Sequence, residues 1–174
     1  MEKRSATFHI PSEAHDPAGS WPKPGGMVFC HRLRVRFSEV DAQKVVFFGN
    51  YFTYFDVALT EFSRSHGIRS LLPQDHEFHV VHASTDYVRP IRYDEEIDVA
   101  IQPERVGTSS ITFRTVISGS SRQDVRARGL IVWVLTDQSS GRGAPLPEPI
   151  RQALPASHPA PEQSSEGAGR AVRT

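Results

Sequence analysis

The chain of 174 residues has a single cysteine, Cys30, so no disulfide bond can form within it. Acidic and basic side chains balance to a formal charge of zero, whereas nucleic-acid-binding proteins normally carry a basic surplus. No apolar run approaches the roughly 20 residues that span a bilayer. No apolar stretch follows Lys3 and Arg4, as a secretory signal would require. These absences disfavour a disulfide-stabilised, nucleic-acid-binding or membrane protein, and we expect a cytoplasmic location.

The two ends of the chain differ in composition from the middle. Residues 1–27 contain several prolines and glycines without a sustained apolar period, and residues 155–174 are polar and rich in Pro, Gly and Ser. Such segments bury too little apolar surface to offset the entropy lost on ordering. We therefore expect flexible extensions at 1–27 and 155–174 around one folded domain, residues 28–154, which has an ordinary domain size.

One amphipathic pattern predicts a long helix of about 16 residues from Tyr51 onward. Asn50 is a suitable N-cap and Gly67 a suitable C-cap. The aromatic load of this segment indicates burial on more than one of its faces. The apolar side chains at helical spacing are Tyr51, Phe55, Ala58, Leu59 and Phe62.

Five other segments have the alternation or the continuous apolar run that is typical of strands. They are residues 29–37, 78–89, 95–106, 109–118 and 125–136, and a short helix is expected at 147–154. A long helix followed by a meander of strands predicts an α+β fold. The sheet must cover the helix, because nothing else in the chain can bury so many aromatic side chains.

Asp41 is the acidic residue best placed for chemistry. It lies in a loop just before the helix start, with Val40 on one side and the apolar residues 45–48 on the other. A partly dehydrated carboxylate is a better base, and the free amides of a helix N-terminus can stabilise an oxyanion. An ordinary loop aspartate would instead hydrogen-bond its own backbone.

The segment 35–64, VRFSEVDAQKVVFFGNYFTYFDVALTEFSR, resembles the hotdog-fold acyl-CoA thioesterases, most closely the 4-hydroxybenzoyl-CoA thioesterase and YbgC-like branch. The resemblance covers roughly residues 30–154 and implies a long central helix wrapped by an antiparallel sheet of about five strands. It also implies hydrolysis of an acyl- or aroyl-CoA thioester, or of an acyl-carrier thioester, without a metal or other cofactor. The residues that carry it are Asp41-Ala42, Val45-Val46-Phe47-Phe48 and Asn50-Tyr51.

The resemblance assigns a role to individual residues. Asp41 is the nucleophile or the general base, and the backbone N–H of Phe48 is the oxyanion donor, with the N–H of Gly49 as a second candidate. Glu61 is the reserve catalytic acid, although an ion pair with an arginine such as Arg64 would also explain it. The substrate-binding residues are Phe47, Gly49, Asn50, Tyr51 and Asp56.

Asp56 matches an aspartate that contacts the substrate's phenol hydroxyl in the hydroxybenzoyl branch. A solvated carboxylate on the helix surface is the alternative.

Three positions depart from the family pattern. Lys44 stands where a glycine is usual, which would strain the loop if the backbone there needs a positive φ. Phe48 replaces a histidine or tyrosine, so any chemistry must depend on Asp41 and the backbone, and Gly49 replaces a small residue or proline. These departures favour, as an alternative, a hotdog module that binds acyl thioesters without hydrolysis. A hotdog dehydratase or hydratase is a further alternative, although its motif is absent.

The family also implies a homodimer whose sheets join edge to edge, often paired into a tetramer, with active sites at the subunit interface. The phosphates of CoA need cationic partners. Candidates near strand ends are Arg89, Arg92, Arg105, Arg122, Arg126 and Arg128.

The histidines at 76, 79 and 82 do not predict a metal site. On a strand His79 and His82, three residues apart, point to opposite faces, and no cysteine or well-placed carboxylate completes a ligand set. Dinucleotide and P-loop motifs are absent as well.

Overall fold

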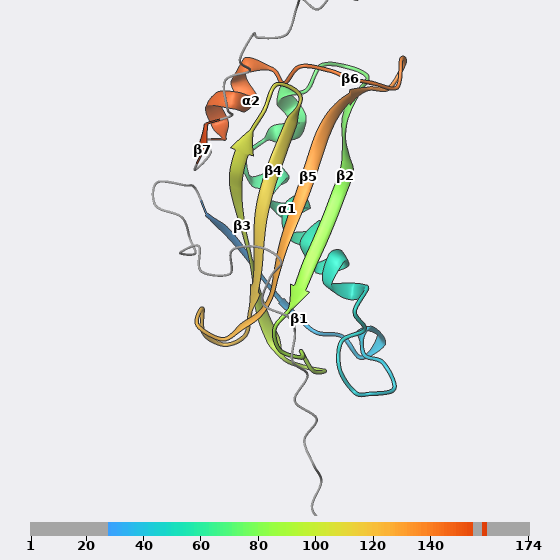
Figure 1. Ribbon diagram of the computed structural model, residues 1–174, viewed down its shortest axis with the longest axis vertical. Coiled ribbons are helices and arrows are strands. Elements are labelled where there is room, and N and C mark those ends of the chain that lie inside the picture. The colour runs from blue at the N-terminus through green and yellow to red at the C-terminus, as the bar shows by residue number, and fades with distance from the viewer. Residues whose placement is uncertain (1–27, 155–157, 160–174) are drawn as a thin grey trace, which may run out of the picture.

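A computed structural model describes residues 28–154 and 158–159 (Figure 1). The predicted flexible extensions, 1–27 and 155–174, lie outside the described residues except for His158–Pro159. In chain order the elements are β1 (Phe29–Arg34), η1 (Phe37–Glu39), α1 (Asn50–Ser65), η2 (Ile68–Leu71), β2 (His76–Tyr87), β3 (Glu96–Val106), β4 (Ser110–Ser118), β5 (Val125–Asp137), β6 (Arg142–Gly143), α2 (Glu148–Ala153) and β7 (His158–Pro159).

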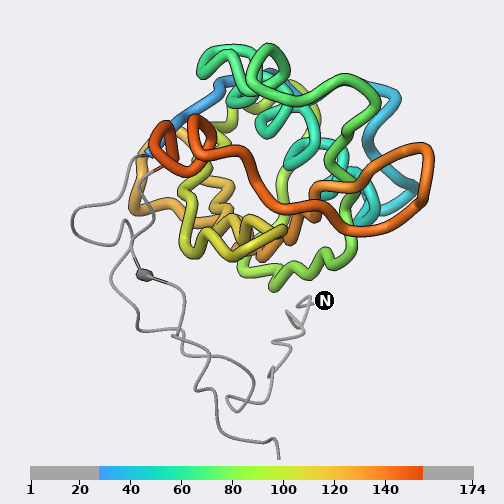
Figure 2. The backbone as a smooth tube through the Cα atoms, turned by 90° about the horizontal axis from the view of Figure 1, so that it is seen from above, coloured from blue at the N-terminus to red at the C-terminus, as the bar shows by residue number. Residues whose placement is uncertain are grey.

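The five long strands form one antiparallel sheet in the order β1-β3-β4-β5-β2. β6 pairs with β5, and β7 lies parallel to β3. The sheet curves around α1, which lies along one of its faces (Figures 1 and 2). The predicted α+β hotdog fold is therefore confirmed, and the five predicted strands agree with the observed ones to within a few residues.

The core lies between α1 and the concave face of the sheet. Every second residue of β3 points into it, because side chains alternate along a strand, and Ile97, Val99 and Ile101 are fully buried. From the helix, Phe62 meets Phe113 of β4 edge to face, with ring centroids 5.6 Å apart. The helix buries aromatic residues on more than one of its faces, as its sequence predicted: Tyr51, Tyr54, Phe55 and Phe62.

Gly129 of β5 lets the helix lie close to the sheet. A Cβ atom at this position would lie 2.8 Å from Cε2 of Phe55 and 2.5 Å from Oγ1 of Thr115. Both distances are shorter than any tolerable contact, so the chain needs a residue without a side chain here. The thickness of the core under the centre of α1 depends on this glycine.

The two ends of α1 differ slightly from the prediction. The N-cap is Gly49, not Asn50, and no side chain caps the helix start. Asn50 is the first helical residue, and its Nδ2 donates instead to the carbonyl of Glu39 at 2.8 Å. At the other end Gly67, with φ 61°, follows the C-cap His66, so it occupies the left-handed position that ends many helices.

β2 forms one edge of the sheet, and within residues 28–154 it pairs only with β5. A bulge at Val81 shifts its register, so His79 pairs with Val134 and His82 with Val132. The two histidines therefore lie on the same face of the sheet, and the prediction of opposite faces was wrong because it assumed a regular strand. No group of three potential metal ligands occurs among the residues that the structure describes.

No helix in the described ranges is both long enough and apolar enough to cross a membrane.

Candidate active site

The Asp41 loop is a closed turn between η1 and α1. The Asp41 amide donates to the Val45 carbonyl at 2.9 Å, and the Lys44 amide donates to the Asp41 carbonyl at 2.9 Å. The half-buried Asp41 carboxylate accepts the Gln43 amide through Oδ1 at 2.8 Å. The bond to its own backbone that we considered as the alternative is thus present. It uses one oxygen and leaves Oδ2 without a partner in the described part of the chain.

Both ends of this loop are held to other parts of the fold. Val40 and Val46 form a bridge across its base. The Val46 amide donates to the Ile91 carbonyl at 2.8 Å, and the Phe47 amide donates to the Glu39 carbonyl at 2.9 Å. Asp41 therefore lies on a loop whose two ends are fixed by hydrogen bonds to the rest of the fold.

Lys44 has φ 64°, in the left-handed region where a residue with a Cβ is strained. The family's usual glycine at this position thus has a physical reason, and this chain folds the same turn with a lysine. The cost is confined to an exposed residue, so it does not alter where the Asp41 carboxylate lies.

Glu39 connects the loop to the rest of the domain, and the sequence analysis missed it. Its nearly buried carboxylate accepts the Tyr54 hydroxyl at 2.8 Å, and the amide and Nε of Arg36, each also at 2.8 Å. Its own carbonyl accepts Phe47 and Asn50, as described above. The available signal was local: Glu39 follows Arg36 by three residues, so its carboxylate can reach back to the Arg36 amide at the start of η1.

Two amides stand free where the loop enters α1. The Asn50 amide donates to the Phe47 carbonyl at 2.9 Å, and the Phe52 amide donates to the Gly49 carbonyl at 3.2 Å. The amides of Phe48 and Gly49, which lie between those of Phe47 and Asn50, donate to no residue in the described ranges. These are the two groups that the resemblance assigned as oxyanion donors.

The phenyl rings of Phe47 and Phe48 are exposed to solvent at this point of the chain. Phe48 is 63% exposed, and its ring centroid lies 4.4 Å from that of Phe47. The two rings thus form a small exposed aromatic surface next to the unpaired amides in the sequence.

The other predicted site residues are placed differently. Tyr51 is buried against Tyr54 and Tyr87, and this burial raises the pKa of its hydroxyl. Asp56 is exposed, and Glu61 forms an ion pair with Arg64, as the alternative reading expected. Glu61 also lies about 16 Å along the helix from Asn50, at 1.5 Å per residue. Within one chain, Glu61 is therefore remote from Asp41.

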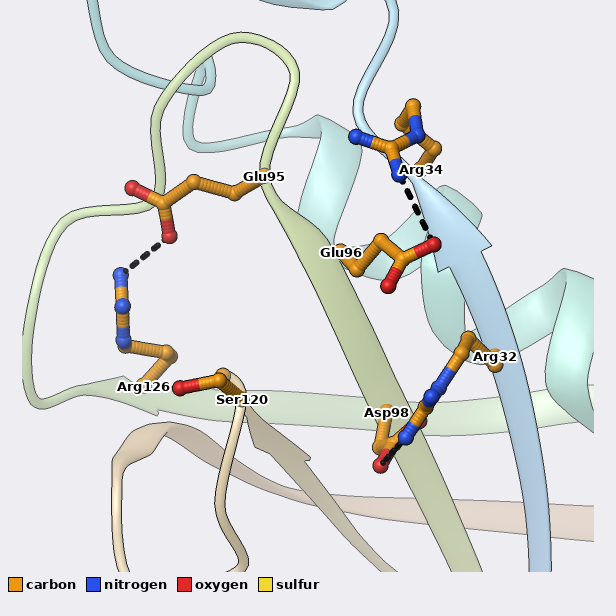
Figure 3. Close-up of a pocket in the computed structure, with 8 residues that line it drawn as sticks. Arg32, Arg34, Glu95, Glu96, Asp98, Ser120 and Arg126 are labelled. Carbon is orange, nitrogen blue, oxygen red and sulfur yellow. Dashed lines mark hydrogen bonds and ion pairs between the residues drawn. The ribbon is translucent and has the colours of Figure 1, made fainter.

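A polar cavity of about 460 Å³ opens on the convex face of the sheet, away from α1 (Figure 3). Arg32 binds Asp98 at 2.7 Å, Arg34 binds Glu96 at 2.8 Å and Arg126 binds Glu95 at 2.8 Å. The pairing lowers the pKa of Asp98, because its ionised form accepts the Arg32 bonds. The residues that line the cavity are Arg32, Arg34, Glu95, Glu96, Asp98, Gly119, Ser120 and Arg126.

The cavity does not contain Asp41, and its three cations are cancelled by three carboxylates. It therefore offers no surplus charge to a phosphate. Among the arginines considered for CoA, Arg89 and Arg126 are both bound to Asp124. The side chains of the remaining four form no hydrogen bond or salt bridge with any described residue: Arg92, Arg105, Arg122 and Arg128.

Comparisons with known proteins identify the family. The thioesterase superfamily matches residues 43–125. A putative esterase of Aquifex aeolicus (strain VF5) is 37% identical over 93 residues, which cover 52% of this chain and 73% of that protein. A 1,4-dihydroxy-2-naphthoyl-CoA hydrolase of Synechococcus sp. (strain CC9311) is 31% identical over 135 residues, or 71% of this chain and 86% of that one. The chain belongs to the thioesterase superfamily.

The fold of this thioesterase agrees with solved structures. The crystal structure of a 1,4-dihydroxy-2-naphthoyl-CoA thioesterase from Synechocystis superposes with a TM-score of 0.65 at 22% identity, covering 73% of this chain and 95% of that one. Membership confirms the predicted hotdog-fold acyl-CoA thioesterase, an enzyme that hydrolyses thioesters.

Replacing Lys44 with glycine should stabilise the thioesterase. Relief of the left-handed strain outweighs the added freedom of the unfolded chain, so Lys44→Gly should raise the free energy of unfolding by about 0.5–1 kcal/mol in a urea titration. Gln43→Gly, one residue earlier and without a positive φ, is the control and should lower it. Equal effects of the two substitutions would contradict the strain at position 44.

Tyr54→Phe should destabilise the protein at neutral pH by about 1.5–3 kcal/mol, because it removes a hydrogen bond to a charged group. Burial and the bond to Glu39 raise the pKa of Tyr54 above that of an unfolded tyrosine. Its contribution is complete below about pH 10 and is lost as the pH rises further, because the unfolded chain then ionises. Denaturant titrations from pH 7 to 11 measure both effects.

In these titrations the difference in free energy of unfolding between wild type and Tyr54→Phe should become smaller above pH 10. Tyr93→Phe, at an exposed tyrosine without a hydroxyl partner among the described residues, should leave the free energy of unfolding unchanged at pH 7. A constant gap across this range would refute the role of the Tyr54 hydroxyl.

Proposed function

We propose that this thioesterase hydrolyses an aroyl-CoA thioester with Asp41 as its catalytic carboxylate and the amides of Phe48 and Gly49 as its oxyanion donors. The observation that carries the proposal is the combination of a free Oδ2 on Asp41 with two unpaired amides where the same loop enters α1. The loop base holds Asp41, and the bond from the Asn50 amide to the Phe47 carbonyl holds the peptide that carries the Phe48 amide, so these two groups need little reorientation when a substrate binds.

An aromatic acyl group is supported by two independent features. The Synechococcus relative is named for a dihydroxynaphthoyl thioester. The exposed rings of Phe47 and Phe48 offer aromatic contact area beside the oxyanion donors. Asp56, exposed on the helix, remains the candidate acceptor for a ring hydroxyl of the substrate.

Two routes use the same groups. In the first, Asp41 attacks the thioester carbonyl, the carbon–sulfur bond breaks, CoA leaves as the thiolate, and water then hydrolyses the resulting anhydride. In the second, Asp41 takes a proton from water as the water attacks the carbonyl, and the carbon–sulfur bond of the resulting tetrahedral intermediate then breaks, so that the acid forms and CoA leaves as the thiolate. In both, negative charge develops on the carbonyl oxygen, and loss of one backbone donor would cost about 3 kcal/mol of barrier. Neither route requires a metal or a redox cofactor.

The CoA phosphates need guanidinium partners that are not already neutralised. The arginines that meet this condition within the described ranges are Arg92, Arg105, Arg122 and Arg128, whereas the paired arginines of the convex cavity do not meet it. We therefore expect the nucleotide end of the substrate to lie outside that cavity.

A second copy of the chain completes the proposed site. β2 leaves one edge of the sheet unpaired in the described chain, and Val80 and Val81 on it are 55% and 60% exposed. The unpaired N–H and C=O groups of such an edge can pair with the same strand of a second copy. A dimer joined here, or a pair of such dimers, would also cover Tyr87 at the end of β2. The lone cysteine suits a reducing cytoplasm.

Asp41→Asn tests the catalytic proposal. Asparagine keeps an oxygen for the Gln43 amide, so the loop should retain its shape while the base or nucleophile is lost. The kcat for benzoyl-CoA and for 1,4-dihydroxy-2-naphthoyl-CoA should fall by about 10²–10⁴, measured as thiol release. Asp75→Asn, at an exposed turn residue ahead of β2, is the matched control and should keep wild-type kcat.

Substrate binding without turnover by the wild-type chain would instead support the non-hydrolytic module. A wild-type kcat in Asp41→Asn would remove Asp41 from the mechanism.

Val81→Asp tests the proposed dimer. An added charge in a paired edge would be buried, so the variant should shift toward single chains in sedimentation equilibrium and lose turnover. Gln123→Glu adds a charge at an exposed turn residue and should leave the assembly unchanged. A wild-type chain that sediments as a monomer at micromolar concentration while remaining active would overturn the proposal.

A further inference from the structure

Tyr87, the last residue of β2, reaches across to the start of α1. Its hydroxyl donates to the carbonyl of Phe48 at 3.1 Å. Its ring meets the buried Tyr51 ring edge to face, with centroids 4.8 Å apart and planes at 87°. The ring contact fixes where the hydroxyl lies, and the hydroxyl joins the edge strand to the loop that carries the oxyanion donors.

The bonded carbonyl belongs to the same peptide group as the Gly49 amide. A peptide group is planar and almost always trans, so its C=O and N–H point in opposite directions. A donor bound to the Phe48 oxygen therefore fixes the direction of the Gly49 N–H. It also polarises the group, because hydrogen bonds in a chain strengthen one another.

The two candidate donor peptides differ in how they are held. The Phe48 N–H belongs to the peptide whose carbonyl, that of Phe47, accepts the Asn50 amide at 2.9 Å. The Phe48 carbonyl accepts the Tyr51 amide at only 3.4 Å, which is long for an N–H···O bond. The helix therefore gives the second peptide only a long bond, and the Tyr87 hydroxyl, at 3.1 Å, is the nearer of the two donors to its carbonyl.

We propose that Tyr87 is a positioning residue for the oxyanion site: its hydroxyl orients and polarises the Phe48–Gly49 peptide so that the Gly49 N–H stabilises the developing negative charge. This inference depends on the oxyanion role of Gly49 proposed above. Tyr87 does not touch the reacting atoms and acts only through the peptide. Partial burial raises the pKa of its hydroxyl, so the group remains a donor across the neutral range.

Tyr87→Phe isolates the hydroxyl, because it keeps the ring that packs against Tyr51. With benzoyl-CoA, kcat should fall about three- to tenfold while KM stays near the wild-type value, since one hydrogen bond acting in the transition state is lost. Tyr93→Phe removes a hydroxyl from another exposed tyrosine, whose ring meets Phe37, and should leave both constants unchanged.

A spectroscopic measurement separates positioning from a general loss of structure. The ketone analogue of benzoyl-CoA, with CH2 in place of sulfur, binds without being cleaved, and its carbonyl stretch shifts to lower frequency as hydrogen bonds to its oxygen strengthen. In Tyr87→Phe this shift should be smaller than in wild type, and the melting temperature should change little. An unchanged shift together with an unchanged kcat would overturn the role of Tyr87.

The two proposals fail in different ways. If wild type hydrolyses benzoyl-CoA and Asp41→Asn does not, but Tyr87→Phe equals wild type, only the role of Tyr87 is refuted. If kcat falls in Tyr87→Phe but the carbonyl shift of the bound ketone is retained, the hydroxyl acts elsewhere and the inference is refuted as well. Wild-type protein that hydrolyses no aroyl-CoA, with Asp41 intact, refutes the proposed function itself.

Discussion

The buried carboxylate of Glu39 is the point on which the site depends. A charge removed from water is stable only when its oxygens are bonded, and Glu39 meets this condition with Tyr54 on the helix and Arg36 directly before η1. Its main chain then accepts both Phe47 and Asn50. One residue thereby fixes both ends of the loop that carries Asp41. The loop is held against the packed core and is rigid for that reason.

The local patterns were enough to predict the elements and the loop, but not how that loop is held. The aromatic residues of α1 recur at helical spacing, because the residues at this spacing face the core and are buried there. Glu39 was missed because its partner Tyr54 lies 15 residues further along the chain, and only the folded helix brings them together. The error at His79 and His82 has a similar origin. The bulge residue Val81 moves His82 to the face that His79 occupies, and the local sequence does not indicate this bulge.

The departures from the family pattern have a common consequence. Lys44 adopts a left-handed backbone conformation that a glycine would adopt without strain, and Phe48 keeps the amide while lacking a polar side chain. In both cases the main chain is preserved and the side chain is altered. The resemblance to the family is therefore retained at positions 44 and 48, although the residue types there differ from the family pattern.

The two exposed phenylalanines at the start of α1 have a consequence for how such an enzyme can diverge. The groups assigned to the oxyanion are main-chain amides, which every residue except proline possesses. If the proposed site is right, mutation at positions 47 and 48 can change the surface beside the acyl group while the backbone oxyanion donors are retained. Substrate selectivity then depends on side chains, whereas oxyanion stabilisation depends on the backbone. A change of substrate therefore does not require a change in the groups that stabilise the oxyanion.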